Sequence, residues 1–429
     1  MNIRRSIWAG TLVVAALLLV LTLSGTTAAQ STLTPEEELG KAIFFDLNLS
    51  LNRNQSCATC HAPESGWTGP DSAINAGGSV YAGSIQDAFG DRKPPSSAYA
   101  TQSPVLHVDK KGVFTGGNFW DGRATGKILG SPAAEQAKGP FLNPKEQALP
   151  DAAALVQRVC TASYGELFRQ VWGGDICNPT NVAVAYNSIG FSIAAYEGSP
   201  EVNAFSSKFD ASFGGRAKLT QVERNGMALF LGKGKCAACH TLRGPGSLFT
   251  DYTYDNLGLP KNPANPVYRS DPTFVDPGLG GFLALRPEYA GYADANLGKH
   301  KVPTVRNVGL GLPGIVKAYG HNGYFKTLEG IVHFYNTRDI LPRCAGDYPE
   351  SEALAAGCWP APEVAANVNT AKLGNLGLSA AEEAAIVAFL KTLSDGYLPG
   401  AVSAAGLDPD QAQTGVQLFV PAIQAHAAP

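Results

Sequence analysis

Basic charge is in short supply in this sequence of 429 residues. It contains 33 Lys and Arg against 36 Asp and Glu, which gives a formal net charge of -3 and a pI near 6.2. A surface that binds nucleic acid needs a clear excess of positive charge. The composition therefore offers no case for a nucleic-acid-binding protein.

Long apolar runs are also scarce, and the single clear one extends from Ile7 to Leu23. Arg4 and Arg5 precede it, and small residues from Ser24 to Ala29 follow it, an order typical of a secretory signal peptide cleaved after Ala29. An uncleaved anchor is the alternative, although the run is short for a bilayer span. No later stretch is long and apolar enough to span, so we expect no stable membrane insertion after cleavage.

Cysteine, in contrast, is present in a telling pattern. Cys57-Ala58-Thr59-Cys60-His61 and Cys236-Ala237-Ala238-Cys239-His240 both have the spacing of a c-type haem attachment site. Two thiols three positions apart can form thioethers to one porphyrin while the adjacent imidazole reaches its iron. A zinc or redox cysteine pair is the alternative, and the repeat behind an export signal weakens it. We expect two covalently bound haem c groups, with His61 and His240 as iron ligands.

The four other cysteines form two pairs that are local in the sequence. Disulfides Cys160 to Cys177 and Cys344 to Cys358 are plausible in an oxidising compartment, and free buried thiols are the alternative. Signal peptide, haems and disulfides all predict a periplasmic protein.

The chain reads as a duplication. Capping boxes at Thr34 to Glu37 and at Thr220 to Glu223 each open a helix that leads into a haem motif. A capped helix from Ser379 closes the second copy. We predict a mainly α fold of two cytochrome-c-like haem domains with long loops. The predicted segments are a signal peptide (1–29), a peroxidatic-haem domain (30–215), an electron-transfer-haem domain (216–397) and a tail of low order (398–429).

The haem sites and five further motifs occur in an order that resembles the bacterial dihaem cytochrome c peroxidases and their MauG relatives. The resemblance covers roughly residues 34 to 395. Besides the haem sites, it rests on Leu39-Gly40-Lys41 with Phe44-Phe45-Asp46, Phe119-Trp120-Asp121-Gly122-Arg123, Gly139-Pro140 with Asn143-Pro144-Lys145-Glu146, Val302-Pro303-Thr304-Val305-Arg306-Asn307, and His321-Asn322-Gly323 with Thr327-Leu328-Glu329.

Methionine is the usual distal ligand of an electron-transfer haem, and the mature chain has only Met227, inside the helix before the second haem motif. The resemblance places the distal ligand of the second haem at Tyr335. Family peroxidases carry methionine there, whereas MauG carries tyrosine. A tyrosine oxygen is a harder donor that stabilises oxidised iron. Core packing of Tyr335 and ligation by His333 are the alternatives.

The first haem is expected to have an open distal side. Family peroxidases often have a blocking histidine in the loop after the first motif, and residues 71–90 contain no histidine. His107 is a weaker alternative. The duplication pairs the position of Tyr335 with the neighbourhood of Pro140, which has no donor atom. The resemblance assigns Glu146 to proton transfer during peroxide cleavage, with Gln136 as a possible hydrogen-bond partner.

Other roles implied by the resemblance concern the space between the haems. Trp120 is expected to relay electrons between them, with plain packing as the alternative. Arg123, Arg306 and Lys301 are candidates to bind haem carboxylates. A calcium ion between the domains is possible, with Gln102 in place of the family asparagine and with backbone oxygens of Val316 to Tyr319.

The expected function is peroxidase activity, in which hydrogen peroxide is reduced to water with electrons from a small cytochrome c or a cupredoxin. The MauG-like alternative uses a stored oxidised state of both haems to oxidise a protein side chain. A rival of another class is a non-catalytic dihaem electron carrier. A homodimer remains open.

Overall fold

The structure is a computed structural model that describes residues 33–311 and 314–398. The expected signal peptide (1–29) and nearly all of the expected tail (398–429) lie outside these residues. None of the described helices is both long and apolar enough to cross a membrane.

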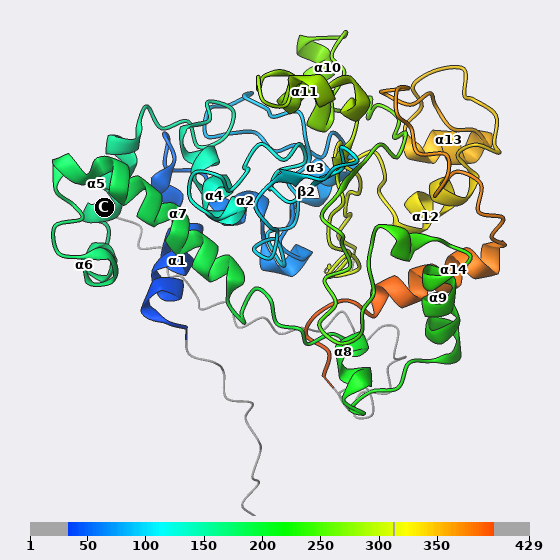
Figure 1. Cartoon of the computed structure of the whole chain (residues 1–429), viewed down its shortest axis with the longest axis horizontal. Helices are drawn as coiled ribbons and strands as arrows, with labels where there is room; N and C mark the ends of the chain where they lie inside the picture. Colours follow the sequence, from blue (N-terminus) through cyan, green and yellow to red (C-terminus); the bar gives the residue numbers. More distant parts are fainter. Residues whose placement is uncertain (1–32, 312–313, 399–429) are drawn as a thin grey trace, which may run out of the picture. The chain divides into compact units, whose positions relative to one another are not determined.

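Helices dominate and long loops connect them, as predicted (Figure 1). In the first half of the chain the helices are α1 (Pro35–Phe45), α2 (Cys57–Cys60), α3 (Ser72–Ala76), α4 (Pro132–Leu142), α5 (Ala152–Thr161), α6 (Gly165–Trp172), α7 (Val182–Gly198) and α8 (Lys208–Phe213). In the second half they are α9 (Gln221–Leu231), α10 (Val267–Ser270), α11 (Gly278–Ala284), α12 (Leu328–Thr337), α13 (Glu350–Ala356) and α14 (Ala380–Lys391).

Short elements fill the loops. The 3-10 turns are η1 (Leu47–Leu49), η2 (Pro63–Ser65), η3 (Pro179–Asn181), η4 (Cys236–Ala238), η5 (Ala290–Tyr292) and η6 (Asp294–Asn296). The strands form two antiparallel pairs, β1 (His107–Val108) with β2 (Phe114–Thr115) and β3 (Tyr254–Asp255) with β4 (His300–Lys301). In the second pair, Tyr254 lies opposite Lys301.

The capping boxes start their helices where the sequence predicts. Thr34 and Glu37 exchange side-chain to backbone hydrogen bonds at the start of α1. Thr220 and Glu223 do the same at α9, and Ser379 caps α14 in the same way. Each box satisfies backbone N–H groups that the first helical turn leaves without partners.

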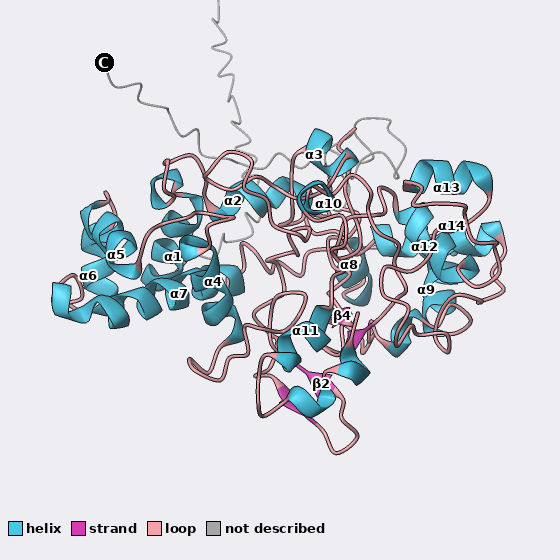
Figure 2. Ribbon diagram, turned by 90° about the horizontal axis from the view of Figure 1, so that it is seen from above, coloured by secondary structure: helices cyan, strands magenta, loops and turns pink. Residues whose placement is uncertain are grey.

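A glycine in each half shows the duplication in three dimensions. A Cβ atom on Gly40 of α1 would overlap the Ser192 carbonyl of α7, and one on Gly226 of α9 would overlap the Ala385 carbonyl of α14. The helix pairs α1/α7 and α9/α14 therefore cross by the same close backbone contact. In Figure 2 the α1/α7 pair lies on the left and the α9/α14 pair on the right.

Each crossing packs against a cluster of three aromatic rings. The Phe44 ring centroid is 5.9 Å from that of Trp67 and 5.6 Å from that of Tyr196. In the second half, the Phe230 ring centroid is 6.1 Å from that of Phe249 and 5.3 Å from that of Phe389 on α14. The two clusters lie at corresponding places, which confirms two related helical cores.

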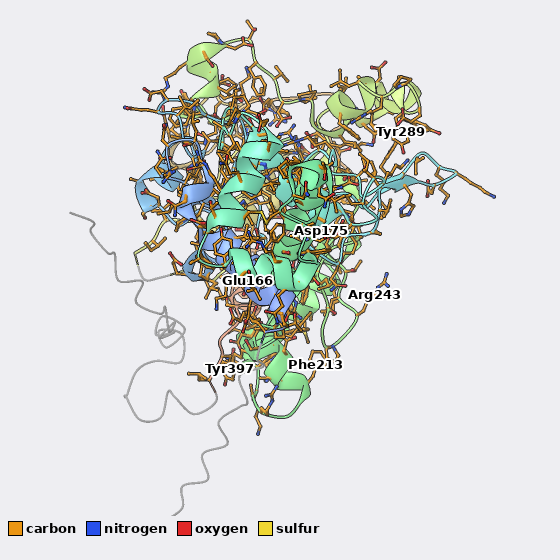
Figure 3. The ribbon with its side chains drawn as sticks, turned by 90° about the vertical axis from the view of Figure 1, so that its left-hand side faces the viewer. Glu166, Asp175, Phe213, Arg243, Tyr289 and Tyr397 are labelled. Carbon is orange, nitrogen blue, oxygen red and sulfur yellow. A yellow bond between two sulfur atoms is a disulfide. The ribbon has the colours of Figure 1, made fainter. Side chains whose placement is uncertain are left out.

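The predicted boundary between residues 215 and 216 stays a prediction. Phe209 of α8 already packs into the second core, with its ring centroid 5.2 Å from that of Phe249. The N–H of Tyr397 donates to the Ser206 carbonyl, so the two ends of the second core meet beside α8 (Figure 3). The described residues, from Leu33 to Leu398, form one compact unit.

Both predicted disulfides are present, Cys160–Cys177 and Cys344–Cys358. The first joins α5 to the loop after α6, near the labelled Glu166 and Asp175 in Figure 3. Each closes a short loop and so limits the freedom of the unfolded chain.

Candidate functional site

The first haem motif lies on α2 and the residue that follows it. Cys57 and Cys60 are half-buried free thiols, and His61 comes directly after the helix. The Nδ1 atom of His61 is 3.3 Å from the Trp67 carbonyl oxygen, so this nitrogen carries the proton and Nε2 is left with a lone pair. Burial lowers the pKa of His61 to about 4. The imidazole is therefore neutral and suited to bind a metal through Nε2.

The second motif repeats this arrangement. Cys236 and Cys239 are half-buried free thiols, and the Nδ1 atom of His240 is 3.0 Å from the Phe249 carbonyl oxygen. Burial lowers the pKa of His240 below its ordinary value. Trp67 and Phe249 occupy corresponding places in the two aromatic clusters. The two histidines are therefore oriented by backbone carbonyls at corresponding positions.

The thiols of both motifs favour the neutral form. Burial raises the pKa of Cys60 and Cys236 to about 12 and that of Cys239 to about 11. Zinc binding requires thiolates, which are usually stabilised by nearby positive charge. Neutral thiols beside a neutral imidazole fit thioether attachment of a haem.

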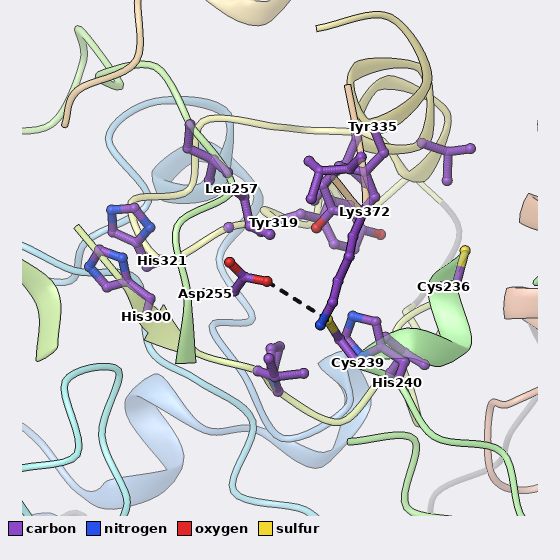
Figure 4. Close-up of a pocket in the computed structure, with 18 of the residues that line it drawn as sticks. Cys236, Cys239, His240, Asp255, Leu257, His300, Tyr319, His321, Tyr335 and Lys372 are labelled. Atoms are coloured by element: carbon purple, nitrogen blue, oxygen red, sulfur yellow. Dashed lines mark hydrogen bonds between the residues drawn. The ribbon is translucent and has the colours of Figure 1, made fainter. Parts of the chain in front are cut away.

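A large cavity adjoins the second motif and is mostly apolar (Figure 4). Cys236, Cys239 and His240 lie on one side of it, and Tyr335 of α12 lines the same cavity. Burial raises the pKa of Tyr335, and the thiol sulfurs of the motif act in the same direction. The residues present fit a haem, which His240 and Tyr335 would hold.

The alternatives to Tyr335 are less well placed. His333 does not line the large cavity, and its Nδ1 atom is 3.1 Å from each carboxylate oxygen of Glu383 on α14. Met227 packs against the second apolar core and also lies outside the cavity wall. Ligation by Tyr335 stays a prediction that these positions support.

Glu146 lies close enough to the first motif for its carboxylate to raise the pKa of both Cys57 and Cys60. Asn143 donates from Nδ2 to the Glu146 carboxylate at 2.6 Å, which fixes the side chain within its loop. Burial raises the pKa of Glu146. A carboxyl group with a raised pKa beside a reaction site can both accept and return a proton.

Gln136 and His107 are brought to different environments. Gln136 lies on α4 and lines a small cavity together with Pro95 and Trp120. The backbone of Pro95 lies close enough to His61 to affect its pKa, which places this cavity next to the first motif. His107 is exposed on β1 with Nδ1 at 3.0 Å from the Val105 carbonyl, so its position does not favour iron ligation.

Trp120 lies in the wall that separates the two cavities, and it lines both of them. Its indole N–H donates to the Lys93 carbonyl oxygen at 2.8 Å, and the side chain is 9% exposed. Lys301 lines both cavities as well, and burial lowers its pKa to about 7. An aromatic ring held between two sites is suited to carry electrons between them.

The two arginines predicted to bind haem carboxylates are engaged elsewhere. Arg306 is completely buried and forms a bidentate ion pair with Asp210, at 2.8 and 2.9 Å, while its Nε donates to the Ser247 carbonyl. Arg123 pairs with Asp121 and lies over the Phe119 ring. Their contacts with haem stay predictions, and Lys301 is the better-placed candidate of the three.

Sequence reasoning missed a stacked pair of histidines in the large cavity. The rings of His300 and His321 are 3.5 Å apart and nearly parallel, with an interplanar angle of 8°. Both Nε2 atoms are buried and form no hydrogen bond among the described residues. Asp276 approaches the Nε2 of His300 to 3.2 Å, and Arg92 binds that carboxylate in a bidentate manner. The sequence signal was indirect, since His321 occupies the position that corresponds to Trp120.

A metal ion does not suit this histidine pair. The lone pair of an imidazole nitrogen lies in the plane of the ring, and two parallel planes 3.5 Å apart do not meet at one ion. The two oxygens of a carboxylate, in contrast, could each meet one ring nitrogen. The pair lies across the large cavity from Cys236 and His240 (Figure 4).

The expected calcium site does not fit the residues that are present. Gln102 lies in a turn and is exposed. The Val316 carbonyl oxygen accepts a hydrogen bond from the Asn75 side chain at 2.9 Å, and the Lys317 ammonium group is buried in the same segment. An N–H donor and an ammonium group thus lie where oxygen ligands are needed.

Comparison with known proteins agrees with this geometry. The sequence model of the family described as di-haem cytochrome c peroxidase matches residues 34–218. The methylamine utilization protein MauG of Paracoccus denitrificans is 37% identical over 366 residues, which cover 83% of this chain and 88% of that protein. A cytochrome-c peroxidase of Pseudomonas sp. is 28% identical over 376 residues, which cover 83% of this chain and 80% of that protein.

A solved structure extends the similarity to the fold. The crystal structure of the diheme peroxidase BthA from Burkholderia thailandensis matches with a TM-score of 0.69 and 32% sequence identity, over 85% of this chain and 87% of that chain. The chain thus belongs to the di-haem cytochrome c peroxidase family, and it is a peroxidase-type oxidoreductase that uses two haem groups.

Proposed function

We propose that this chain is a periplasmic dihaem c-type peroxidase that reduces hydrogen peroxide to water with electrons from a small redox protein. His61 belongs to the haem that meets peroxide, and His240 and Tyr335 belong to the haem that passes electrons. The observation that carries this proposal is the position of Trp120 in the wall common to both cavities.

The haem irons supply the redox chemistry, and the side chains around them handle protons and orientation. Glu146 accepts the proton of the peroxide oxygen nearest the first iron and returns it to the leaving oxygen, so that water departs. Its raised pKa suits both transfers. The Lys93 carbonyl fixes the Trp120 indole between the sites. Two electrons and two protons from outside complete the conversion of one peroxide into two waters.

His300 and His321 line the cavity across from Cys236 and Cys239 and would bind the carboxylates of a haem attached through these cysteines. The Nδ1 of His300 is 3.1 Å from the Gly298 carbonyl and holds one proton. Its Nε2 must gain a second proton to bond a carboxylate. Burial lowers the pKa of His300 to about 4, and the Asp276 carboxylate opposes that effect.

We expect His300→Phe to flatten the pH dependence of the midpoint potential of the second haem, since Phe keeps the stacking surface and removes the proton site. One proton taken up per electron corresponds to about 59 mV per pH unit. Spectroelectrochemical titration at several pH values measures this slope. His107→Phe, on the exposed strand β1, is the matched control, and equal slopes in the two variants would contradict the assignment.

The MauG-like reaction is the second candidate, and the placement of Tyr335 favours it. A hard oxygen ligand stabilises oxidised iron, so oxidising equivalents could be held and drawn from a docked protein side chain in place of a small electron donor. The two disulfides support the periplasmic location under either reaction.

The first test is the absorption and electron paramagnetic resonance spectrum of the ferric protein as purified, before and after hydrogen peroxide. We expect one high-spin haem with an open site and one low-spin haem, and a rapid change on adding peroxide. Two low-spin haems that do not react with peroxide would support the electron-carrier alternative and contradict the enzyme proposal.

A further inference from the structure

Buried lysine side chains occupy cages of oxygen atoms where the two halves of the chain meet. Lys317 is the clearest case, because its Nζ donates to the Ser65 and Asn307 carbonyl oxygens at 2.9 Å and to the Leu310 carbonyl at 2.6 Å. Ser65 follows the first haem motif, and the other two oxygens follow the second. All three N–H groups of this ammonium are used, and the bond to Ser65 joins segments 252 positions apart in the sequence.

Lys326 makes a second junction of the same kind. Its Nζ donates to the Gly77 carbonyl and the Ser79 hydroxyl at 2.8 Å, and to the Gly323 carbonyl at 2.6 Å. Lys93 is also buried, and its Nζ donates within the first half, to the Thr68 hydroxyl at 3.0 Å and to the Pro94 carbonyl at 2.9 Å.

No carboxylate within the described residues forms an ion pair with Lys317 or Lys93. A buried ammonium without a counter-ion is costly unless polar groups surround it. Cages built from backbone carbonyls are the usual surroundings of a hard cation such as calcium. The lysine side chains therefore occupy the kind of environment that a metal ion would otherwise require.

We propose that the ammonium groups of Lys317 and Lys326 are built-in cations that hold the two halves together in place of a calcium ion. Two further observations agree with the replacement of calcium by lysine side chains. The Val316 carbonyl, a ligand expected for calcium, is taken by the Asn75 amide, and Gln102, the expected side-chain ligand, is exposed. The proposal concerns assembly of the halves and is independent of the reaction proposed above.

The first experiment uses the haem-loaded wild-type protein. It is dialysed against EGTA, its calcium content is measured by elemental mass spectrometry, and its haem spectrum and thermal unfolding are recorded with and without added calcium. Burial and the Lys93 charge lower the pKa of Lys317 to about 7, so these measurements are made at pH 6, where the amine is protonated.

The expected result is no bound calcium, an unchanged haem spectrum and an unchanged Tm on adding calcium, since an ion that binds only the folded state would raise the Tm. Stoichiometric calcium, or a spectrum or Tm that depends on calcium, would overturn the proposal. These wild-type measurements decide the question even where a lysine variant fails to fold.

The second experiment compares Lys317→Met with Lys218→Met. Methionine fills a similar volume but leaves three carbonyl oxygens without a donor, and we expect the Tm to fall by about 5 °C or more. Lys218 is exposed, so its variant is the matched control and should unfold like the wild type. Equal Tm values for the two variants would show that Lys317 does not hold the halves together.

Discussion

Glu146→Gln is expected to slow the reaction with hydrogen peroxide by about 100- to 10,000-fold, the usual contribution of a positioned general acid–base group. The amide keeps an oxygen that can accept the 2.6 Å hydrogen bond from Asn143, so the loop should keep its conformation. It cannot accept the peroxide proton. Stopped-flow absorbance at the haem band measures the rate directly, without an electron donor.

The pH dependence of the same rate adds a second check. Burial raises the pKa of Glu146, so the carboxylate form is lost as the pH falls through a value above the ordinary one for glutamate. The wild-type rate should fall across that interval, and the variant should show no such limb. Glu166→Gln, at a side chain that is 87% exposed on α6, is the control. A Glu146 variant that reacts as fast as this control would show that another group moves the proton.

How far the sequence could predict the structure depended on how local each interaction was. The capping boxes at Thr34 and Thr220 and the two disulfides join residues close in the chain, and the structure contains all of them. Tyr335 was placed by the family resemblance, which rests on the nearby motif Thr327-Leu328-Glu329, and it lines the cavity beside the second haem motif. Such features depend on few long-range contacts.

Features that bring distant loops together were harder to predict. Arg306 looked free to bind a carboxylate, but its partner Asp210 lies 96 positions away and no pattern links them. His300 stacks on His321, and it lies on a strand of two residues, which is too short to show a periodic sequence pattern. Lys317 interrupted an expected calcium segment, yet the carbonyl groups that surround it come from two loops far apart in the sequence. Their contacts follow from the path of the loops.

Burial gives these missed groups a common physical feature. Glu197 on α7 is another example, since burial raises its pKa to about 8 and its charge affects the Cys57 thiol. A carboxyl group this close to the first haem site would be neutral near pH 7, unlike an exposed glutamate. The sequence alone could not distinguish it from a surface residue, because the end of α7 is packed against loops from elsewhere.

Tyr335→Met is expected to raise the midpoint potential of the second haem by about 100 mV or more, because axial ligands set haem potentials over a range of about 0.8 V. A thioether is a softer donor than a phenol oxygen and favours ferrous iron. Redox titration followed by absorbance measures the change. Tyr319→Phe is the matched control, since Tyr319 lines the same cavity but its hydroxyl donates to the Val308 carbonyl.

Tyr335→Phe separates ligation from packing at the same position. Phenylalanine preserves the ring in the cavity wall and removes the oxygen, so the second haem should change from low spin to high spin if Tyr335 is its ligand. His333 does not line the cavity and is not placed to replace the lost ligand. A second haem that stays low spin in Tyr335→Phe, with an unchanged potential in Tyr335→Met, would remove Tyr335 as the ligand and with it the main support for the MauG-like reaction.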